Sequence, residues 1–348
     1  MIDLRGRHFL STLDFSSGEL CAITDLALKI KRDEMHGRLP GKVLSLLFFN
    51  PSVRTRVSCE SAMARMGGHA ITLNPGKDTW NFEHGEGVVM DGNTQEHVKE
   101  LAPVLSSFCD AIGIRKSELI TTGANRAEVT ASYDELKQDL FINRFTEFSN
   151  KPVINLESNS SHPLQGLADM ATLKEEFGEP RGRKYVLTWA YHPKPLPVAT
   201  PHSQLLAAAD LGMDITILRP PGYDLDGEFV EAARNRTGAQ GGSLEVTDDI
   251  DSAYDGAQAV CAKSWGSLEY YGRFDEEARM KQALKAAWIV DEAKLARTDD
   301  AIFMHCLPVR RNVVVTDGVI DSPRSVVLKE AENRLWTVAA LLQCLLGG

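Results

Sequence analysis

Short apolar runs rich in β-branched residues alternate with longer helical patterns along the whole chain. The runs that we expect to be strands are 43–49, 111–114, 153–154, 185–188, 215–218, 259–261, 288–290 and 302–303. Such alternation is typical of β-α-β units that build parallel sheets covered by helices. The chain has 348 residues, which exceeds the size at which one hydrophobic core usually divides. We therefore expect an α/β protein with two domains.

The helical patterns suggest where one domain gives way to the other. A charged helix is expected over 133–150, and a second series of alternating elements begins after it, at Lys151-Pro152. The last segment, from 330 to 346, has apolar residues at helical spacing and must dock on one of the domains. We expect a first domain of residues 1–150 plus 326–348 and a second domain of residues 151–325.

The composition argues against several classes of protein. The apolar runs are too short to span a bilayer and the charged N-terminus leads into no apolar signal core, so we expect a cytoplasmic protein without a membrane partner. The net charge of -10 argues against nucleic-acid binding, which needs a basic face. The six cysteines have no paired spacing, which favours reduced thiols over a zinc site or a disulfide framework.

A polar segment follows the first strand run and begins a helix. Its sequence is Ser52-Val53-Arg54-Thr55-Arg56, with two hydroxyls and two guanidinium groups where the backbone N–H groups of a helix start would point at an anion. An S-x-R sequence alone is more often a helix cap with a solvated arginine. Two arginines and two hydroxyls together instead predict a phosphate cradle without a glycine-rich loop.

Two further motifs follow this cradle in order, His162-Pro163-Leu164-Gln165 and His305-Cys306-Leu307-Pro308. With the cradle they resemble the aspartate and ornithine carbamoyltransferase family over essentially the whole chain. One tetrapeptide is weak evidence, whereas three motifs in this order and at these spacings are specific. The resemblance implies two parallel-sheet domains of the aspartate/ornithine carbamoyltransferase type, the first binding carbamoyl phosphate and the second the amine acceptor.

The resemblance also assigns roles around the reacting atoms. Attack by an amine develops negative charge on the carbonyl oxygen and on the leaving phosphate, so donors must surround both. The implied catalytic residues are Arg115 and His162 at the carbonyl oxygen, Gln165 as an acceptor for the carbamoyl NH₂, and Cys306 as a positioning group. The implied carbamoyl phosphate-binding set is Ser52, Val53, Arg54, Thr55, Arg56, Trp80, Arg115, His162, Gln165, Cys306, Leu307 and Arg334. No metal, cofactor or covalent intermediate is expected, because binding the reactants in line supplies much of the acceleration.

The acceptor loops distinguish the branches of this family. Ornithine carbamoyltransferases carry a Ser-Met-Gly segment after a strand, whereas residues 262–267 here read Ala-Lys-Ser-Trp-Gly-Ser. The Pro-rich loop 191–197 and Trp80 in its long loop resemble the N-acylornithine carbamoyltransferases. That branch implies a knotted Pro-rich loop and a homotrimer with shared active sites, in which Trp80 reaches into the neighbour's site. The implied acylornithine-binding residues are Gln95, Glu157, Lys263 and Arg310.

The sequence leaves two acyl groups possible for the acceptor, acetyl and succinyl. Acetyl-specific members have a glutamate at the position of Gln95 and succinyl-specific members a proline; a glutamate would repel a succinyl carboxylate, and Gln95 would not. Residues 75–78 resemble the acetyl type, and 309–316 resemble the succinyl type, with Val314 where the acetyl type has a lysine. We favour N-acetyl-L-ornithine, giving N-acetyl-L-citrulline and phosphate, because acetylated intermediates are the commoner route in arginine biosynthesis. N-succinyl-L-ornithine is the alternative.

Three other interpretations compete with this one. A Rossmann-type dehydrogenase needs a G-x-G-x-x-G turn after a strand, and the sequence has none. The Trp80 loop and the Pro-rich loop argue against an aspartate carbamoyltransferase, and the missing Ser-Met-Gly segment argues against an ornithine carbamoyltransferase. A non-catalytic carbamoyl phosphate-binding subunit would be expected to lack some site residues, whereas all three motifs are intact here.

Overall fold

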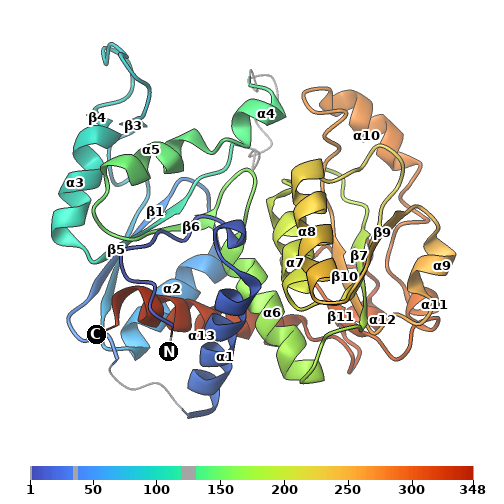
Figure 1. Ribbon diagram of the computed structural model, residues 1–348. Coiled ribbons are helices and arrows are strands. Elements are labelled where there is room, and N and C mark those ends of the chain that lie inside the picture. The colour runs from blue at the N-terminus through green and yellow to red at the C-terminus, as the bar shows by residue number, and fades with distance from the viewer. Residues whose placement is uncertain (1, 34–37, 119–130, 348) are drawn as a thin grey trace. The chain divides into compact units, whose positions relative to one another are not determined.

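The computed structural model describes residues 2–33, 38–118 and 131–347, which form two α/β units (Figure 1). Unit 1 contains the described residues up to Glu118, the range Asp134–Leu164 and the chain from Arg334 onward. Unit 2 contains residues 165–333 together with 131–133. The junctions at 164/165 and 333/334 lie later in the chain than the expected boundaries at 150/151 and 325/326.

Unit 1 is built on a four-stranded parallel sheet in the order β2-β1-β5-β6. Its strands are β1 (Val43–Phe48), β2 (His69–Leu73), β5 (Ala111–Arg115) and β6 (Val153–Glu157), and β3 (Phe82–Glu83) pairs separately with β4 (Glu96–His97). Its helices are a 3-10 turn (Thr12–Asp14), α1 (Ser17–Asp33), α2 (Val53–Arg65), α3 (Val98–Phe108), α5 (Leu140–Phe148) and the C-terminal part of α13 (Val327–Leu346). The short helix α4 (Tyr133–Leu136) lies at a junction between the units.

The core of unit 1 explains why strands β5 and β6 read as apolar runs. Every residue of β5 and β6 is buried, because helices cover both faces of the sheet. One core cluster joins the sheet to α3 and α5 through Leu47, Val98, Leu101, Ile112, Ile114, Phe141, Phe145 and Val153. The prediction of a single charged helix over 133–150 is wrong. Asp139 has a left-handed φ of 47°, and this residue separates α4 from α5.

Unit 2 is built on a five-stranded parallel sheet in the order β11-β10-β7-β8-β9. Its strands are β7 (Lys184–Trp189), β8 (Asp214–Leu218), β9 (Leu244–Thr247), β10 (Ala259–Lys263) and β11 (Ile302–Met304). Its helices are α6 (Pro163–Phe177), α7 (Ala199–Asp210), α8 (Gly227–Ala239), α9 (Ile250–Tyr254), α10 (Phe274–Gln282), α11 (Glu292–Leu295), α12 (Asp317–Ile320) and the start of α13. The buried helix α7 packs on α8 and on the sheet (Figure 1).

The expectation of parallel-sheet α/β units is confirmed, with errors at particular strands. The run 288–290 is not a strand, because only Val290 forms an isolated bridge, to Val315. Strands β2 and β9 lie at sheet edges, and their partly exposed residues gave no apolar run. None of the helices in the described ranges combines the length and the apolar character needed to cross a lipid bilayer.

Candidate active site

The segment predicted to be a phosphate cradle forms the N-terminus of α2, directly after β1. Ser52 caps this helix, with its Oγ accepting from the backbone N–H of Thr55 at 3.2 Å. The first turn contains no acidic residue, so the positive end of the helix dipole is not offset locally. Val53 has an exposed side chain, and Arg56 pairs with Glu60 at 3.0 Å on the same helix. The first turn thus presents backbone N–H groups as an anion site.

A buried arginine lies beneath this helix start. Arg334 on α13 is only 2% exposed, and its Nη2 donates to Thr55 Oγ1 at 3.0 Å. Its Nη1 lies 3.3 Å from His162 Nε2. Burial lowers the pKa of Arg334 to about 10, so the guanidinium stays protonated at neutral pH. A permanent positive charge therefore stands behind the anion site of α2.

Three buried side chains continue this network at the carboxyl end of the unit 1 sheet. Arg115 ends β5 and Glu157 ends β6, and the two are register partners whose side chains form an ion pair. His162 Nε2 lies 3.5 Å from Glu157 Oε2. His162 Nε2 thus lies between a guanidinium group, which can only donate, and a carboxylate, which accepts. The network contains two guanidinium groups, of Arg115 and Arg334, and one carboxylate, of Glu157. Its net charge is therefore positive, which favours an anionic ligand.

In unit 2, the His305-Cys306-Leu307-Pro308 segment follows β11. The backbone N–H of His305 donates to Glu330 Oε2 at 2.9 Å, and that of Leu307 donates to His305 Nδ1 at 2.9 Å. Leu307 has a left-handed φ of 54° before a cis bond to Pro308, and such a backbone is uncommon for a leucine. Cys306 is half-buried. Backbone conformations of this kind gather at functional sites.

A group of cations gathers around the Pro-rich loop of unit 2. Arg310 Nε donates to His192 Nε2 at 2.9 Å, and His192 Nδ1 lies 2.9 Å from the carbonyl oxygen of Lys194. Burial lowers the pKa of His192 to about 4, and the charges of Arg310, Lys263 and Lys281 act in the same direction. His192 is therefore neutral at physiological pH and serves as an acceptor for Arg310. Lys263 and Arg310 together form a cationic pole suited to a carboxylate.

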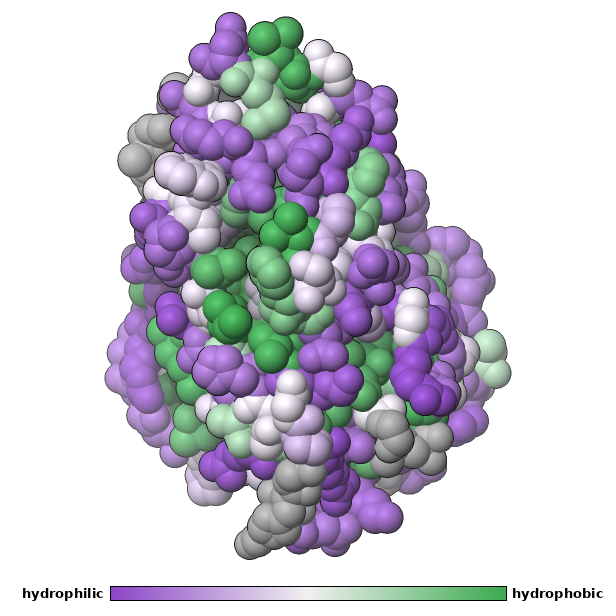
Figure 2. Space-filling view, turned by 90° about the vertical axis from the view of Figure 1, so that its left-hand side faces the viewer, coloured by the Kyte–Doolittle hydropathy of each residue, from purple (hydrophilic) through white to green (hydrophobic). Residues whose placement is uncertain are grey.

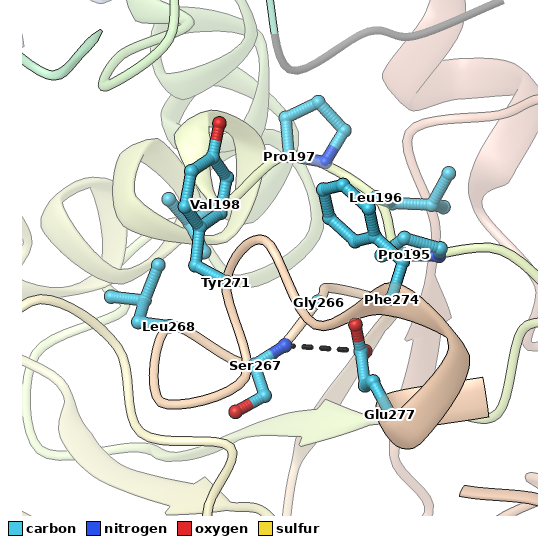
Figure 3. A pocket seen from close by; sticks show the side chains of 10 residues that line it. All are labelled: Pro195, Leu196, Pro197, Val198, Gly266, Ser267, Leu268, Tyr271, Phe274 and Glu277. Carbon is cyan, nitrogen blue, oxygen red and sulfur yellow. Dashed lines mark hydrogen bonds between the residues drawn. The ribbon is translucent and has the colours of Figure 1, made fainter. Parts of the chain in front are cut away.

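An open pocket lies between the Pro-rich loop and the segment after β10 (Figure 3). It is lined by Pro195, Leu196, Pro197, Val198, Gly266, Ser267, Leu268, Tyr271, Phe274 and Glu277. The N–H of Gly266 donates to the carbonyl of Leu196 at 2.8 Å. A Cβ at Gly266 would lie only 2.9 Å from Pro195 Cβ, so this close approach requires glycine.

Trp80, expected to reach a neighbouring subunit, and Gln95, expected to face the acyl group, both lie in the segment between β2 and β4. Trp80 is 63% exposed, and Gln95 is exposed with its backbone N–H bonded to the carbonyl of Asn81 at 3.1 Å. The pairing of Phe82 with Glu96 and of Glu83 with His97 clamps the loop that carries Gln95. Neither side chain is needed for the packing of the single chain.

Comparison with known proteins identifies the family. A model of the carbamoyl-P binding domain of aspartate/ornithine carbamoyltransferases matches residues 7–175, and one of the Asp/Orn binding domain matches residues 198–345. The chain belongs to the aspartate/ornithine carbamoyltransferase family. The resemblance drawn from the three motifs is thereby confirmed, as is the fold type.

Within the aspartate/ornithine carbamoyltransferase family, the chain is similar to acylornithine enzymes. It is 44% identical to the N-acetylornithine carbamoyltransferase of Xanthomonas campestris pv. campestris over 98% of both chains. It is 36% identical to the N-succinylornithine carbamoyltransferase of Bacteroides thetaiotaomicron over 95% of this chain and 96% of that one. A crystal structure of acetylornithine transcarbamylase complexed with acetylcitrulline superimposes with a TM-score of 0.92 at 44% identity, covering 98% of this chain and all of that one.

The structure groups the site residues predicted for a carbamoyltransferase by unit. In unit 1 one network contains Thr55, Arg115, Glu157, His162 and Arg334. In unit 2 Glu330 links Gln165 to the segment that contains Cys306 and Leu307. Lys263 and Arg310 form a second group, with both charges close to His192.

Three residues of these groups were missed by sequence reasoning. They are His192, Asp169 and Glu330. Asp169 follows Gln165 by one helical turn, a spacing that is readable in the sequence. His192 lies in a loop that was noted only for its prolines, and no local signal marks Glu330. Among the described residues, no three His, Cys, Asp or Glu side chains are arranged to hold a metal ion.

Proposed function

We propose that this protein transfers the carbamoyl group of carbamoyl phosphate to the side-chain amine of N-acetyl-L-ornithine, giving N-acetyl-L-citrulline and phosphate in arginine biosynthesis. The observation that carries the donor half is the buried Arg334 behind the capped start of α2. The acceptor half is supported by the full-length similarity to an N-acetylornithine carbamoyltransferase and to a structure holding acetylcitrulline.

In this proposal the phosphate of the donor binds the first turn of α2. The N–H groups after Ser52, the guanidinium groups of Arg54 and Arg56, and the charge of Arg334 favour a dianion there. Arg115 and His162 address the carbonyl oxygen, on which negative charge develops as the amine attacks. Glu157 holds Arg115 in place beforehand, so little reorganisation is needed during the reaction.

The carbamoyl NH₂ group is recognised by acceptors. Gln165 Oε1 and the carbonyl oxygen of Leu307 accept its two protons, and Cys306 lies next to Leu307 in the chain as a positioning group. The acceptor substrate is held by its α-carboxylate at Lys263 and Arg310. An N-acylated ornithine carries no charge on its α-nitrogen, which agrees with the absence of the Ser-Met-Gly segment from residues 262–267.

A specific observation favours N-succinyl-L-ornithine as the second candidate. Gln95 is neutral, so it does not repel the carboxylate of a succinyl group. The variant Gln95→Glu is expected to suppress turnover of N-succinylornithine more than that of N-acetylornithine, because only the former has an added carboxylate. Steady-state kinetics with both acceptors measure this, and equal effects on both would show that Gln95 does not face the acyl group.

We also propose a cytoplasmic homotrimer with shared active sites. Trp80 (63%), Val53 (75%) and Val57 (53%) of unit 1 are exposed apolar side chains. Figure 2 shows apolar side chains gathered near the centre of the face on the left of Figure 1, with polar ones around them. Sedimentation tests the assembly. At a carbamoyl phosphate concentration where each variant alone is impaired, mixing Trp80→Ala and Arg54→Ala subunits is expected to restore part of the activity if sites are shared. No recovery after subunit exchange would argue against sharing.

The deciding experiment is product formation from carbamoyl phosphate with N-acetylornithine, N-succinylornithine, free ornithine and aspartate offered separately at equal concentration. Turnover of N-acetylornithine alone is the expected result, and turnover of N-succinylornithine alone would establish the second candidate. Activity only with ornithine or aspartate would overturn the acceptor assignment. Tight binding of carbamoyl phosphate without turnover of any acceptor would indicate a non-catalytic subunit.

A further inference from the structure

The amide of Gln165 is held by two buried carboxylates. Its Nε2 donates to Asp169 Oδ1 at 2.8 Å, one turn along α6, and to Glu330 Oε1 at 2.9 Å, near the start of α13. Gln165 is 2% exposed, and Asp169 and Glu330 are both 0% exposed. Placing two carboxylates in such a site is costly, so the arrangement requires an explanation beyond packing.

The hydrogen bonds fix which end of the amide faces which way. Glu330 accepts through both oxygens, from Gln165 by Oε1 and from the His305 N–H by Oε2 at 2.9 Å. In its carboxylate form Glu330 has no proton to donate, so it can face only the NH₂ end of an amide. Asp169 Oδ1 imposes the same orientation from the other side. Gln165 Oε1 therefore points away from both carboxylates, as an acceptor.

We infer that Asp169 and Glu330 are positioning residues that set the polarity with which Gln165 meets the donor substrate. The inference rests on the proposed function, in which Gln165 accepts from the carbamoyl NH₂. Glu330 has a second effect, because the same carboxylate fixes the backbone of His305 and hence the segment that presents the carbonyl of Leu307. Two acceptors are thus aimed at the NH₂ group. They select carbamoyl phosphate against an acyl phosphate that has a methyl group in place of the NH₂.

The test uses the double variant D169N/E330Q, which keeps the shape of both side chains. The amide introduced by E330Q keeps the bond to the His305 N–H by turning its oxygen there, so its NH₂ group faces Gln165. The amide introduced by D169N can also point its NH₂ group at Gln165. The Gln165 amide is then expected to rotate by about 180°, so that its oxygen accepts hydrogen bonds from the two new NH₂ groups. Gln165 Nε2 then faces the carbamoyl NH₂ as one donor against another, which is unfavourable.

The measured quantity is the ratio of the inhibition constant of acetyl phosphate to the KM of carbamoyl phosphate, with the full-length protein. The ratio is expected to fall about tenfold or more in D169N/E330Q, since one hydrogen bond is lost and an unpaired donor is left buried. Adding Gln165→Glu to the double variant is expected to recover most of the ratio. One oxygen of the carboxylate introduced by this third substitution then accepts from the two new amides, and the other oxygen faces the NH₂ group.

The matched control is Glu175→Gln, on the same pair of helices. Glu175 Oε2 accepts from Asn333 Nδ2 at 3.1 Å and does not contact Gln165. This variant is expected to leave the ratio unchanged, even if it lowers stability. A merely structural role for Asp169 and Glu330 would weaken both ligands equally, so an unchanged ratio in folded D169N/E330Q would overturn the inference. If the double variant does not fold, E330Q alone decides in the same way, with a smaller expected fall.

The outcome for the wild type separates this inference from the proposed function. Absence of any turnover with carbamoyl phosphate would contradict the proposed function and leave the ratio undefined. Normal turnover with a ratio near one would instead overturn the inference, because the site would then not distinguish NH₂ from methyl.

Discussion

Glu157 provides the sharpest test of the charge arrangement in unit 1. Its carboxylate pairs with Arg115 and lies 3.5 Å from His162 Nε2, which Arg334 contacts from the other side. The exposed fractions of Arg115, Glu157 and Arg334 are 8%, 7% and 2%. The variant Glu157→Ala would leave two buried guanidinium groups without the anion between them. We expect this loss to destabilise the sheet edge rather than only the ligand site.

The magnitude follows from the burial of the pair. Removing one partner of a buried ion pair typically costs about 3–5 kcal/mol, because the other charge remains desolvated and unpaired. At about 1.4 kcal/mol per factor of ten, local opening of β5 and β6 should become roughly 100- to 4,000-fold more frequent. Glu157→Gln keeps an acceptor for Arg115 without the charge, so its effect should be smaller. Inorganic phosphate should restore part of the loss in Glu157→Ala by supplying an anion.

Hydrogen exchange of the β5 and β6 amides measures these openings directly, without assuming that the two units unfold together. The control is Glu147→Ala on α5, which removes one of two exposed partners of Arg144 and should leave the exchange of both strands unchanged. A cost below about 1 kcal/mol for Glu157→Ala would refute the reasoning, because the guanidinium groups would then not depend on this carboxylate.

Three further predictions concern the ligand sites. Arg54→Ala should raise the KM for carbamoyl phosphate about 10- to 150-fold, since each charge-assisted phosphate contact contributes about 1.5–3 kcal/mol; wild-type kinetics would contradict the cradle. The imidazole of His192 has a folded pKa of about 4, below its ordinary 6.5, so its contribution to stability is fully present above pH 6.5 and is lost as the pH falls toward 4. An NMR titration of this ring with a midpoint near 6.5 would contradict the burial argument. Gly266→Ala should push the Pro-rich loop away, because the new Cβ would meet Pro195, and should cost about 1–3 kcal/mol of stability with a raised KM for the acceptor. Unchanged melting and unchanged acceptor KM would show that the loop has room to move.

The local pattern of the sequence predicted some parts of this arrangement well. The capped helix after β1 is a local feature, and the polar residues proposed to bind an anion there are five consecutive positions. The alternation of elements predicted the parallel sheets, because strands such as β5 and β6 are buried along their whole length. The edge strands β2 and β9 escaped detection because their partly exposed residues break the apolar runs.

The remaining parts depend on contacts between distant positions. The pairing of Arg115 with Glu157 needs the sheet register, and Arg334 meets Thr55 across 279 positions of sequence. The family resemblance placed these residues in one site, but periodicity and composition could not have done so. The carboxylate of Glu330 is an example. Its contacts with Gln165 and His305 depend on how the start of α13 packs, and no residue close to it in the sequence indicates that packing.

The two-residue ladder between β3 and β4 has a consequence for how such a protein changes over evolutionary time. The loop from His84 to Gln95 is fixed at its base, where Glu83 accepts from the N–H groups of His84 and Gly85. Substitutions at its tip therefore disturb neither the parallel sheet nor the anion site of α2. If Gln95 faces the acyl group as proposed, a lineage can exchange one acyl acceptor for another by mutating this loop while the residues of the first turn of α2 stay unchanged.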